Sequence, residues 1–143
     1  MLTIIGLHNP KTPENIGGVL RAAFAYDANM VAIQGKRYTR VGTDTPSAYK
    51  HIPVLNNINL KSVIPYNCVP VAVDIIEGAT PLYKYCHPDN AFYIFGAEDA
   101  TLGKEITGWC RDVIYVPTKI CMNLAAAVNV VLYDRMAKCT KKH

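Results

Sequence analysis

Short apolar runs alternate along this chain with segments of helical spacing, and this alternation restricts the fold more than any other feature. The apolar runs, which read as buried strands, cover residues 2–7, 30–34, 69–73, 92–95 and 113–116. Strands that alternate with helices form βαβ units, whose strands lie parallel and are covered by helices on both faces. The sequence therefore predicts an α/β fold with a mainly parallel sheet.

Helix signals fall between these runs. Thr12, Pro13 and Glu14 have the character of a helix start, with proline and an acid in the first turn. Asn123 is placed to cap a last helix over 122–137, and the three alanines after Leu124 let another backbone or a flat ligand approach closely. Shorter helices are predicted over 60–64 and 104–110. A loop-to-helix junction after a strand is where α/β proteins bind nucleotides.

Length and composition indicate one folded domain, 1–143. Half of the residues are hydrophobic and 18% are charged, which excludes a disordered chain. Residues 138–143 are expected to form a flexible basic tail, because cations crowd the C-terminus from Arg135 onward. No apolar run approaches a membrane span and no signal peptide is visible, so we expect a cytoplasmic protein with no membrane partner.

Several classes of site are disfavoured by what the sequence lacks. It contains no G-x-G-x-x-G and no P-loop, which argues against a nicotinamide enzyme. Its four histidines have no metal-ligand spacing, so we expect surface or loop histidines and no metal. Five cysteines, an odd number without a C-x-x-C pair, indicate reduced thiols.

Three motifs in order carry the functional information. They are P-x-N-x-G-x-x-x-R at Pro13, Asn15, Gly17 and Arg21; F-G-x-E at Phe95, Gly96 and Glu98; and C-M-N-L-A at 121–125. In this order and spacing they resemble the motifs of the SPOUT superfamily of RNA methyltransferases, in its SpoU/TrmH branch. The resemblance covers nearly the whole chain.

The resemblance implies a fold, a reaction and an assembly. SPOUT proteins have a deep C-terminal trefoil knot, an exception to the rule against knots, which would lie here between about residues 69 and 137 and would form the pocket for S-adenosylmethionine. The implied reaction is ribose 2′-O-methylation of RNA, with tRNA placed ahead of rRNA, leaving S-adenosylhomocysteine. A homodimer is implied because the arginine of one subunit works beside the cofactor of the other.

Site residues carry over where this sequence matches the motifs. Arg21, Asn15 and Asn123 take the catalytic positions. Cofactor contacts are implied at Asp74, Gly96, Glu98, Leu102, Val116, Cys121, Met122 and Leu124. RNA contacts are expected from Arg21 and from a loop with three cations, Lys36, Arg37 and Arg40.

The role of Arg21 has an ordinary alternative, a solvated helix cation or a partner for Glu14 or Asp27. Asn15 and Arg21 are six residues apart, about 240° around a helix, so Asn15 fits the loop or first turn and Arg21 lies about two turns in. An arginine with a pKa above about 12 is a poor base. A positioned guanidinium that stabilises the developing alkoxide is the better interpretation.

Two departures from the family pattern keep alternatives open. Thr101 stands at the usual position of a second motif glycine, with Gly103 two residues later, and Cys121 stands where serine is common. A shifted turn would compensate for the first. A non-catalytic RNA-binding dimer of the same fold and a base methyltransferase of the same superfamily remain the alternatives.

Overall fold

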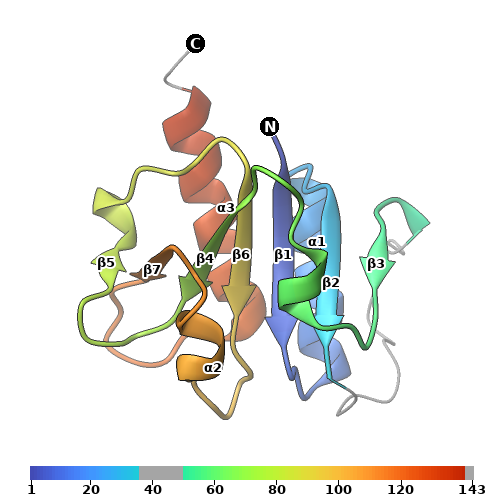
Figure 1. Cartoon of the computed structure of the whole chain (residues 1–143), viewed down its shortest axis with the longest axis horizontal. Helices are drawn as coiled ribbons and strands as arrows, with labels where there is room; N and C mark the ends of the chain where they lie inside the picture. The colour runs from blue at the N-terminus through green and yellow to red at the C-terminus, as the bar shows by residue number, and fades with distance from the viewer. Residues whose placement is uncertain (36–49, 141–143) are drawn as a thin grey trace.

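The computed structural model describes residues 1–35 and 50–140, and these residues form one parallel sheet with the strand order β3-β2-β1-β6-β4-β7-β5 (Figure 1). The strands are β1 (Thr3–His8), β2 (Met30–Gln34), β3 (Val54–Leu55), β4 (Val69–Val73), β5 (Thr80–Pro81), β6 (Ala91–Phe95) and β7 (Asp112–Tyr115). Every pairing between neighbours is parallel. This confirms the predicted α/β class.

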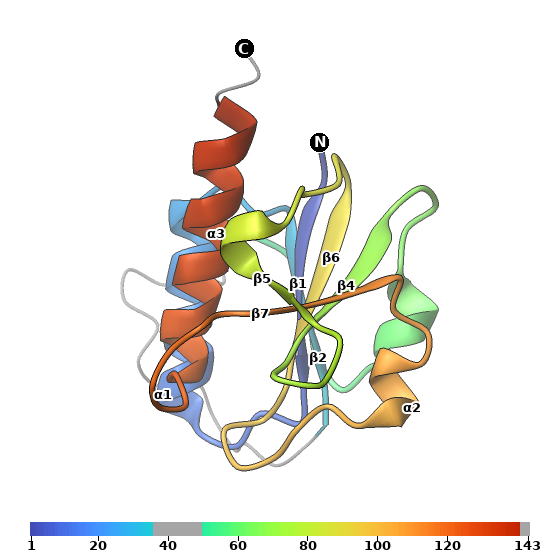
Figure 2. The same cartoon turned by 90° about the vertical axis from the view of Figure 1, so that its left-hand side faces the viewer.

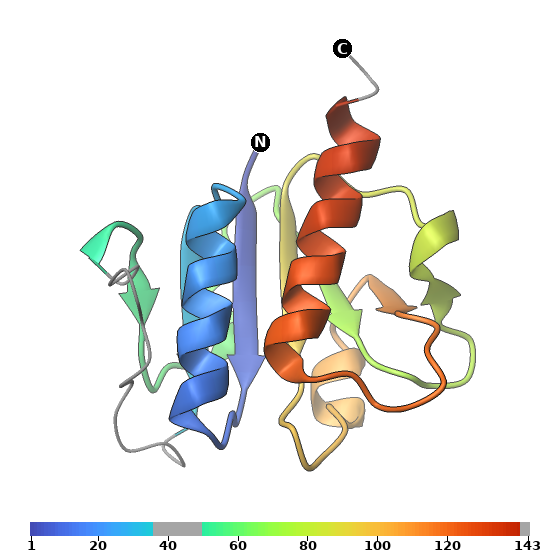
Figure 3. The same ribbon diagram turned by 180° about the vertical axis from the view of Figure 1, so that it is seen from behind.

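Helices cover both faces of the sheet. The helical elements are α1 (Pro13–Ala25), α2 (Lys104–Thr107), α3 (Leu124–Thr140) and two 3-10 turns, η2 (Leu60–Val63) and η3 (Leu82–Lys84). Helices α1 and α3 lie side by side on one face (Figure 3), and α2 lies on the other (Figure 2). Both α1 and α3 start at the same edge of the sheet, where the strands end.

The alternation of side chains along β1 explains the two cores. Ile5 and Leu7 pack beneath α1 and α3, whereas Ile4 packs with Leu60 and Ile106 under η2 and α2. Because successive strand residues point to opposite faces, a strand covered on both sides must be apolar throughout. That requirement is why the central strands appear in the sequence as continuous apolar runs.

One connection crosses the sheet in an unusual way. Ile114 of β7 pairs with Val73 of β4 on one side and with Thr80 of β5 on the other. The chain between those two strands, residues 74–79, therefore passes from one side of β7 to the other. Two strands that are consecutive in sequence are thus separated in space by a strand that comes later.

The predicted elements match the observed ones closely, with differences at their ends. The strand over 30–34 and the start at Pro13 agree, and Asn123 caps α3 because its Oδ1 accepts a hydrogen bond of 3.2 Å from the Ala126 N–H. The last helix begins at Leu124 and runs to Thr140, three residues beyond the predicted end. The short strands β3 and β5 and the turn η3 were not predicted.

The expectation of a flexible basic tail over 138–143 is wrong for its first residues, which belong to α3. Lys138 Nζ donates to the backbone oxygens of Leu82 and Tyr85 at 2.6 and 2.9 Å and pairs with Asp134 at 2.8 Å. These contacts fasten the end of α3 to the η3 turn. Residues 141–143 lie outside the described part of the chain.

Arg135 is likewise not solvated, because it is only 5% exposed. Its guanidinium donates to Thr3 Oγ1, Tyr93 Oη and the carbonyl oxygens of Pro88 and Asp89, at 2.6–3.1 Å. A buried charge is tolerated when its donors are satisfied in this way. Arg135 therefore joins α3 to β1 and to the start of β6.

His87 lies in the loop between η3 and β6, one of the two expected settings for the histidines, but it is buried there at 4% exposed. Its Nδ1 lies 2.6 Å from Tyr93 Oη and its Nε2 lies 2.7 Å from Asp134 Oδ2. Because Arg135 only donates to Tyr93 Oη, the tyrosine hydroxyl is free to donate to Nδ1. A neutral His87 that then donates from Nε2 to Asp134 satisfies every group.

Candidate active site

The three sequence motifs meet at the edge of the sheet where the parallel strands end. Strands β6, β4 and β7 are neighbours, so the segments after Phe95, Val73 and Tyr115 leave the sheet side by side. Strand β1 pairs with β6 on the other side and leads into α1. Crevices outside the carboxyl ends of such strands are the usual binding sites of α/β proteins.

A chain of hydrogen bonds connects the motifs at this edge. Asn123 Nδ2 donates to Asn15 Oδ1 at 2.7 Å, and Asn15 Nδ2 donates to Glu98 Oε1 at 3.0 Å. The amide orientations follow from the two ends of this chain of hydrogen bonds: Asn123 Oδ1 accepts from the Ala126 N–H, and the ionised Glu98 carboxylate can only accept, so the Asn15 amide nitrogen faces it. The structure therefore brings Asn15 and Asn123, the two asparagines predicted to be catalytic, into direct contact.

The Glu98 carboxylate accepts several hydrogen bonds from residues at and just before the start of α1. It accepts from the Lys11 N–H at 2.9 Å and from the Thr12 hydroxyl at 3.3 Å, besides Asn15. Partial burial opposes ionisation of Glu98, but these hydrogen bonds and one from its own backbone outweigh it and hold the pKa of Glu98 below its usual range. This residue, which the sequence assigned to cofactor binding, thus orients Asn15.

Thr12 belongs to this site, although the sequence indicated it only as part of a helix start. It is the N-cap residue of α1, yet its side chain makes no capping bond. Its Oγ1 instead accepts from Asn15 Nδ2 at 2.6 Å and donates to Glu98. The available signal was a hydroxyl residue at a cap position three residues before the motif asparagine.

The segment after β6 folds back over the end of β4. Asp74 Oδ2 accepts from the Leu102 N–H at 3.0 Å, and Asp74 Oδ1 accepts from the Ile75 N–H at 2.9 Å. A Cβ on Gly96 would lie 3.3 Å from the Ala100 carbonyl oxygen and 3.4 Å from Leu102 Cγ. Gly96 therefore lets this segment turn tightly.

The two-residue shift of the motif glycine has a structural counterpart. Gly103 has a φ of +75°, whereas Thr101 does not adopt a positive φ. The left-handed turn, which favours glycine, thus occurs at the position where this sequence has glycine. Thr101 is exposed and stands where a side chain is tolerated.

The remaining residues assigned to the cofactor differ in exposure. Cys121 and Met122 are exposed and Val116 is half-buried, so all three offer side-chain surface at this edge. Leu102 and Leu124 are 1% and 6% exposed, with their side chains in the two cores. Only the backbone of these two leucines is available to a ligand.

Arg21 lies apart from this hydrogen-bonded chain. It is exposed on α1, six residues after Asn15, and among the residues that the structure describes no hydrogen bond or ion pair engages its guanidinium. Neither Glu14 nor Asp27 is seen to pair with it. The structure thus brings Asn15 and Asn123 together but leaves Arg21 facing outward. Lys36, Arg37 and Arg40 lie outside the described residues.

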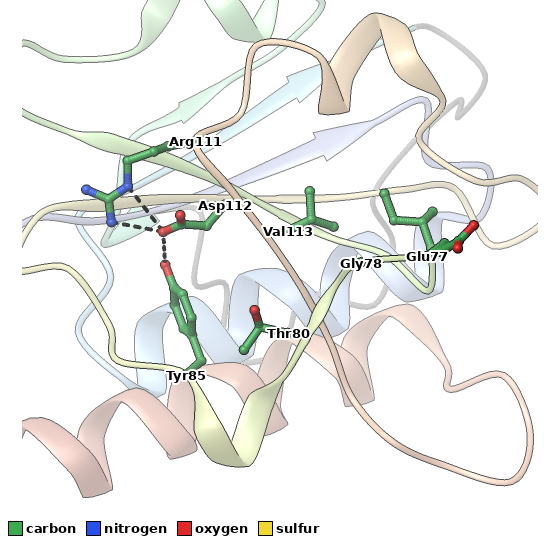
Figure 4. Close-up of a pocket in the computed structure, with 8 residues that line it drawn as sticks. Glu77, Gly78, Thr80, Tyr85, Arg111, Asp112 and Val113 are labelled. Atoms are coloured by element: carbon green, nitrogen blue, oxygen red, sulfur yellow. Dashed lines mark hydrogen bonds and ion pairs between the residues drawn. The ribbon is translucent and has the colours of Figure 1, made fainter.

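A cavity of about 320 Å³ lies along the first residues of β7 and is drawn in Figure 4. The segment that passes across β7, residues 74–79, forms one wall of this cavity at Glu77 and Gly78. On the other side Tyr85 Oη donates to Asp112 Oδ2 at 2.7 Å, and Arg111 donates to the same oxygen at 2.9 and 3.2 Å. These polar groups bind one another, so this cluster holds η3 against β7.

Titration of that cluster follows its contacts. Burial and the Asp112 carboxylate raise the pKa of Tyr85, so its hydroxyl stays a donor. Burial opposes ionisation of Asp112, but hydrogen bonds from Arg111 and Tyr85 hold the pKa of Asp112 below its usual range.

The described residues contain no group of three or more histidine, cysteine or acidic side chains placed to hold a metal ion. No helix among them is long and apolar enough to cross a membrane.

Comparison with known proteins finds a curated relative of this chain. The chain is 23% identical over 146 aligned residues to the 23S rRNA (guanosine-2′-O-)-methyltransferase RlmB of Acinetobacter baylyi, an alignment that covers 92% of this chain and 58% of RlmB. It thus spans less than two thirds of that relative's length.

Solved structures share the fold. The SpoU methyltransferase AviRb from Streptomyces viridochromogenes, determined with the cofactor AdoMet, superposes with a TM-score of 0.87 at 17% identity, covering 97% of this chain and 58% of AviRb. A structure described as giving insight into 2-OH methylation of C/U34 on tRNA superposes with a TM-score of 0.82 at 19% identity, covering 97% of this chain and 91% of that one. The model of the SpoU rRNA Methylase family matches residues 2–133, and the chain belongs to that family.

Proposed function

We propose that this protein transfers the methyl group of S-adenosylmethionine to a ribose 2′-oxygen of RNA. The observation that carries the proposal is the hydrogen-bonded chain from Glu98 through Asn15 to Asn123, which joins all three motifs at the edge where the strands end. Membership of the SpoU rRNA Methylase family supports the same reaction. The alternatives, a base methyltransferase and a non-catalytic RNA-binding dimer, become outcomes of the test below.

The residues at this edge fit the cofactor. Gly96 leaves no side chain where its segment turns, and the exposed Cys121 and Met122 stand at the neighbouring junction. Val116 and the backbone of Leu102 and Leu124 complete the proposed contacts. When bound, the cofactor supplies an activated methyl group, so the protein needs no covalent intermediate with Cys121.

The chain's own side chains supply orientation and charge. An arginine side chain is a cation that donates but does not accept hydrogen bonds, so the role of Arg21 is to stabilise the negative charge that develops on the ribose oxygen. Asn15 and Asn123 fix the start of α3 against the start of α1. Glu98, kept ionised by its donors, holds Asn15 in the orientation that accepts from Asn123. Orientation of this kind supplies a large part of enzymatic rate enhancement.

We further propose a homodimer in which Arg21 works at the partner's cofactor site. Arg21 faces outward and has no partner within the described part of its own chain, as that arrangement requires. Large apolar side chains are exposed on α1, on α3 and on the segment that leads into α3: Phe24, Ile120, Met122, Tyr133 and Met136. Exposed apolar groups of this size are typical of a protein interface.

Mixing two inactive variants tests this shared site. Arg21→Ala subunits keep the cofactor site, and Gly96→Val subunits keep the arginine, so a mixed dimer contains one complete site. We expect the mixture to regain activity after co-refolding, while neither variant is active alone. A mixture that stays inactive, although mass photometry shows mixed dimers, would contradict the shared site.

We also propose that the crossing of residues 74–79 over β7 belongs to a trefoil knot, through which the chain after β7 is threaded. The pairing of Ile114 with both Val73 and Thr80 supports this topology. We expect tRNA rather than rRNA as substrate, and the likeness to a structure that concerns 2-OH methylation of C/U34 on tRNA supports this expectation. The cytoplasm is the expected location.

The experiment that tests the proposed function compares RNA from cells with and without this protein by nucleoside mass spectrometry. We expect one 2′-O-methylated nucleoside of tRNA to disappear when the protein is absent. Loss of a base-methylated nucleoside would favour the base methyltransferase. Unchanged nucleosides, together with retained RNA binding, would favour the non-catalytic dimer.

A further inference from the structure

Gly18 lies where α1 packs closely against Ala125 of α3. A Cβ built on Gly18 would stand 2.7 Å from the Cβ of Ala125. Two carbon atoms in ordinary contact are about 3.5–4.0 Å apart, so an alanine at this position would force the helices about 1 Å further apart. Neither group can rotate away, because a Cβ is fixed to its backbone.

The position of this contact connects it with the hydrogen-bonded chain. Gly18 lies three residues after Asn15 on α1, and Ala125 lies two residues after Asn123 on α3. The contact is therefore within one helical turn of the 2.7 Å hydrogen bond between the two asparagine side chains. A hydrogen bond of that length breaks when its donor and acceptor move apart by about 1 Å.

The core does not need a glycine here. The residues of α1 that pack on the sheet are Ile16, Val19, Leu20 and Ala23, at most 2% exposed, whereas Gly18 lies outside that core cluster and is half-buried. Glycine is also a poor residue for a helix interior. Its presence at position 18 is explained by the close approach of α3.

We propose that Gly18 is a positioning residue for methyl transfer, because it admits the Ala125 Cβ and so sets the helix separation at which Asn123 reaches Asn15. This inference rests on the proposed function, since methyl transfer is its readout. It assigns to Gly18 a role distinct from that of the motif residues on either side of it. Gly18 itself touches neither RNA nor cofactor.

The test uses Gly18→Ala, Ala125→Gly and the double variant that combines them. Gly18→Ala is expected to lower kcat at least about tenfold, since displacements near 1 Å cost up to about a hundredfold, with KM for RNA nearly unchanged. The double variant removes the obstructing Cβ and is expected to return to within about threefold of the original kcat, because contacting residues couple. Gly18→Ala combined with Ala126→Gly is the matched control and is expected to stay slow.

A structural readout accompanies the kinetics. The side-chain amide signals of Asn15 and Asn123 in ¹H–¹⁵N spectra are expected to shift in Gly18→Ala and to return in the Gly18→Ala/Ala125→Gly variant. If Gly18→Ala does not fold, the double variant must still fold and act.

Three results would overturn the role of Gly18: full activity of Gly18→Ala, a slow double variant, or equal rescue by Ala126→Gly. Failure of the proposed function is distinguishable, because it shows in the unmodified protein. If that protein bound its cofactor but methylated no RNA, the proposed function would fall and the role of Gly18 in methyl transfer with it.

Discussion

Asn15 and Asn123 are 108 residues apart in sequence, yet their side-chain amides are joined by a hydrogen bond of 2.7 Å. The other amide atom of each side chain also makes a hydrogen bond: Asn15 Nδ2 donates to Glu98, and Asn123 Oδ1 accepts from the first turn of α3. The start of α1, the segment after β6 and the start of α3 are therefore one hydrogen-bonded unit.

Replacing Asn123 with aspartate separates the two bonds that Asn123 makes. Aspartate still caps α3 and favours a helix N-terminus, so we expect Tm to change by no more than about 4 °C. It cannot donate to Asn15 Oδ1, and it places a second carboxylate near Glu98, so methyl transfer should fall at least about tenfold. Asn67→Asp, which adds the same charge at an exposed position before β4, is the control and should be nearly neutral.

Gly96→Val should abolish cofactor binding. A Cβ at this position already presses against the Ala100 oxygen and Leu102 Cγ, at 3.3 and 3.4 Å, and valine adds two methyl groups. Gly96→Ala should weaken binding less. Calorimetry with S-adenosylmethionine measures both, with circular dichroism as the check on folding. Unchanged affinity in a folded valine variant would remove Gly96 from the site.

His87 makes stability depend on pH. Burial lowers its pKa, although the nearby Asp134 carboxylate acts in the opposite direction. The unfolded chain, with a histidine pKa of about 6.5, therefore takes up a proton before the folded one does. The resulting stability is present above about pH 6.5 and is lost as the pH falls through the folded pKa, by at most about 1.4 kcal/mol per pH unit.

Urea unfolding at several values between about pH 7.5 and 5, on either side of the ordinary histidine pKa, measures this effect. His87→Gln should be less stable at neutral pH but should lose less stability on acidification. His51→Gln, at an exposed histidine, is the control and should follow the original protein. Glu98 and Asp112, whose pKa values lie below their usual range, act only in a more acidic window. Parallel pH curves for the protein and His87→Gln would assign the acid sensitivity elsewhere.

The fold could be read from the sequence where elements are long and apolar, as in β1, β6 and α1. Strands β3 and β5 could not, because two residues have no periodicity, and Pro81 in β5 is tolerated only because that strand lies at the edge. The buried Arg135 was also invisible, since its acceptors come from β1, β6 and the segment before β6.

For the site, motif order predicted which segments come together but not which atoms touch. Glu98 was expected beside the cofactor, and the structure joins it to Asn15 across 83 residues of sequence. Asp74 was expected there too, and its carboxylate holds the backbone of Leu102. Such contacts depend on loop conformations, which local spacing does not determine.

Lys36, Arg37 and Arg40 lie outside the described residues, so both their loop and its contact with RNA stay predictions. Replacing all three with alanine should weaken RNA binding and flatten its salt dependence by about 0.7–0.9 logarithmic units for each phosphate that the variant no longer neutralises. Cofactor binding should not change. Salt titrations of RNA affinity compare the two proteins, and equal slopes would place the RNA surface elsewhere.

Arg21→Ala should leave cofactor affinity nearly intact and lower turnover at least about a hundredfold, the scale for one preorganised donor that stabilises developing charge. Lys61→Ala removes an exposed cation from η2, on the opposite face from α1, and should have little effect. The Arg21→Ala variant must still dimerise for its rate to be compared with that of the original protein. A normal rate would make Arg21 a surface cation.

The most direct measurement of the central claim uses purified protein, methyl-labelled S-adenosylmethionine and tRNA from cells that lack the protein. After digestion, mass spectrometry of the labelled nucleoside locates the methyl group on the ribose or on the base. We predict label on a ribose, with at least about a hundredfold less in a parallel reaction with Arg21→Ala. Label on a base, or no transfer to RNA by a dimer that binds the cofactor, would contradict the account.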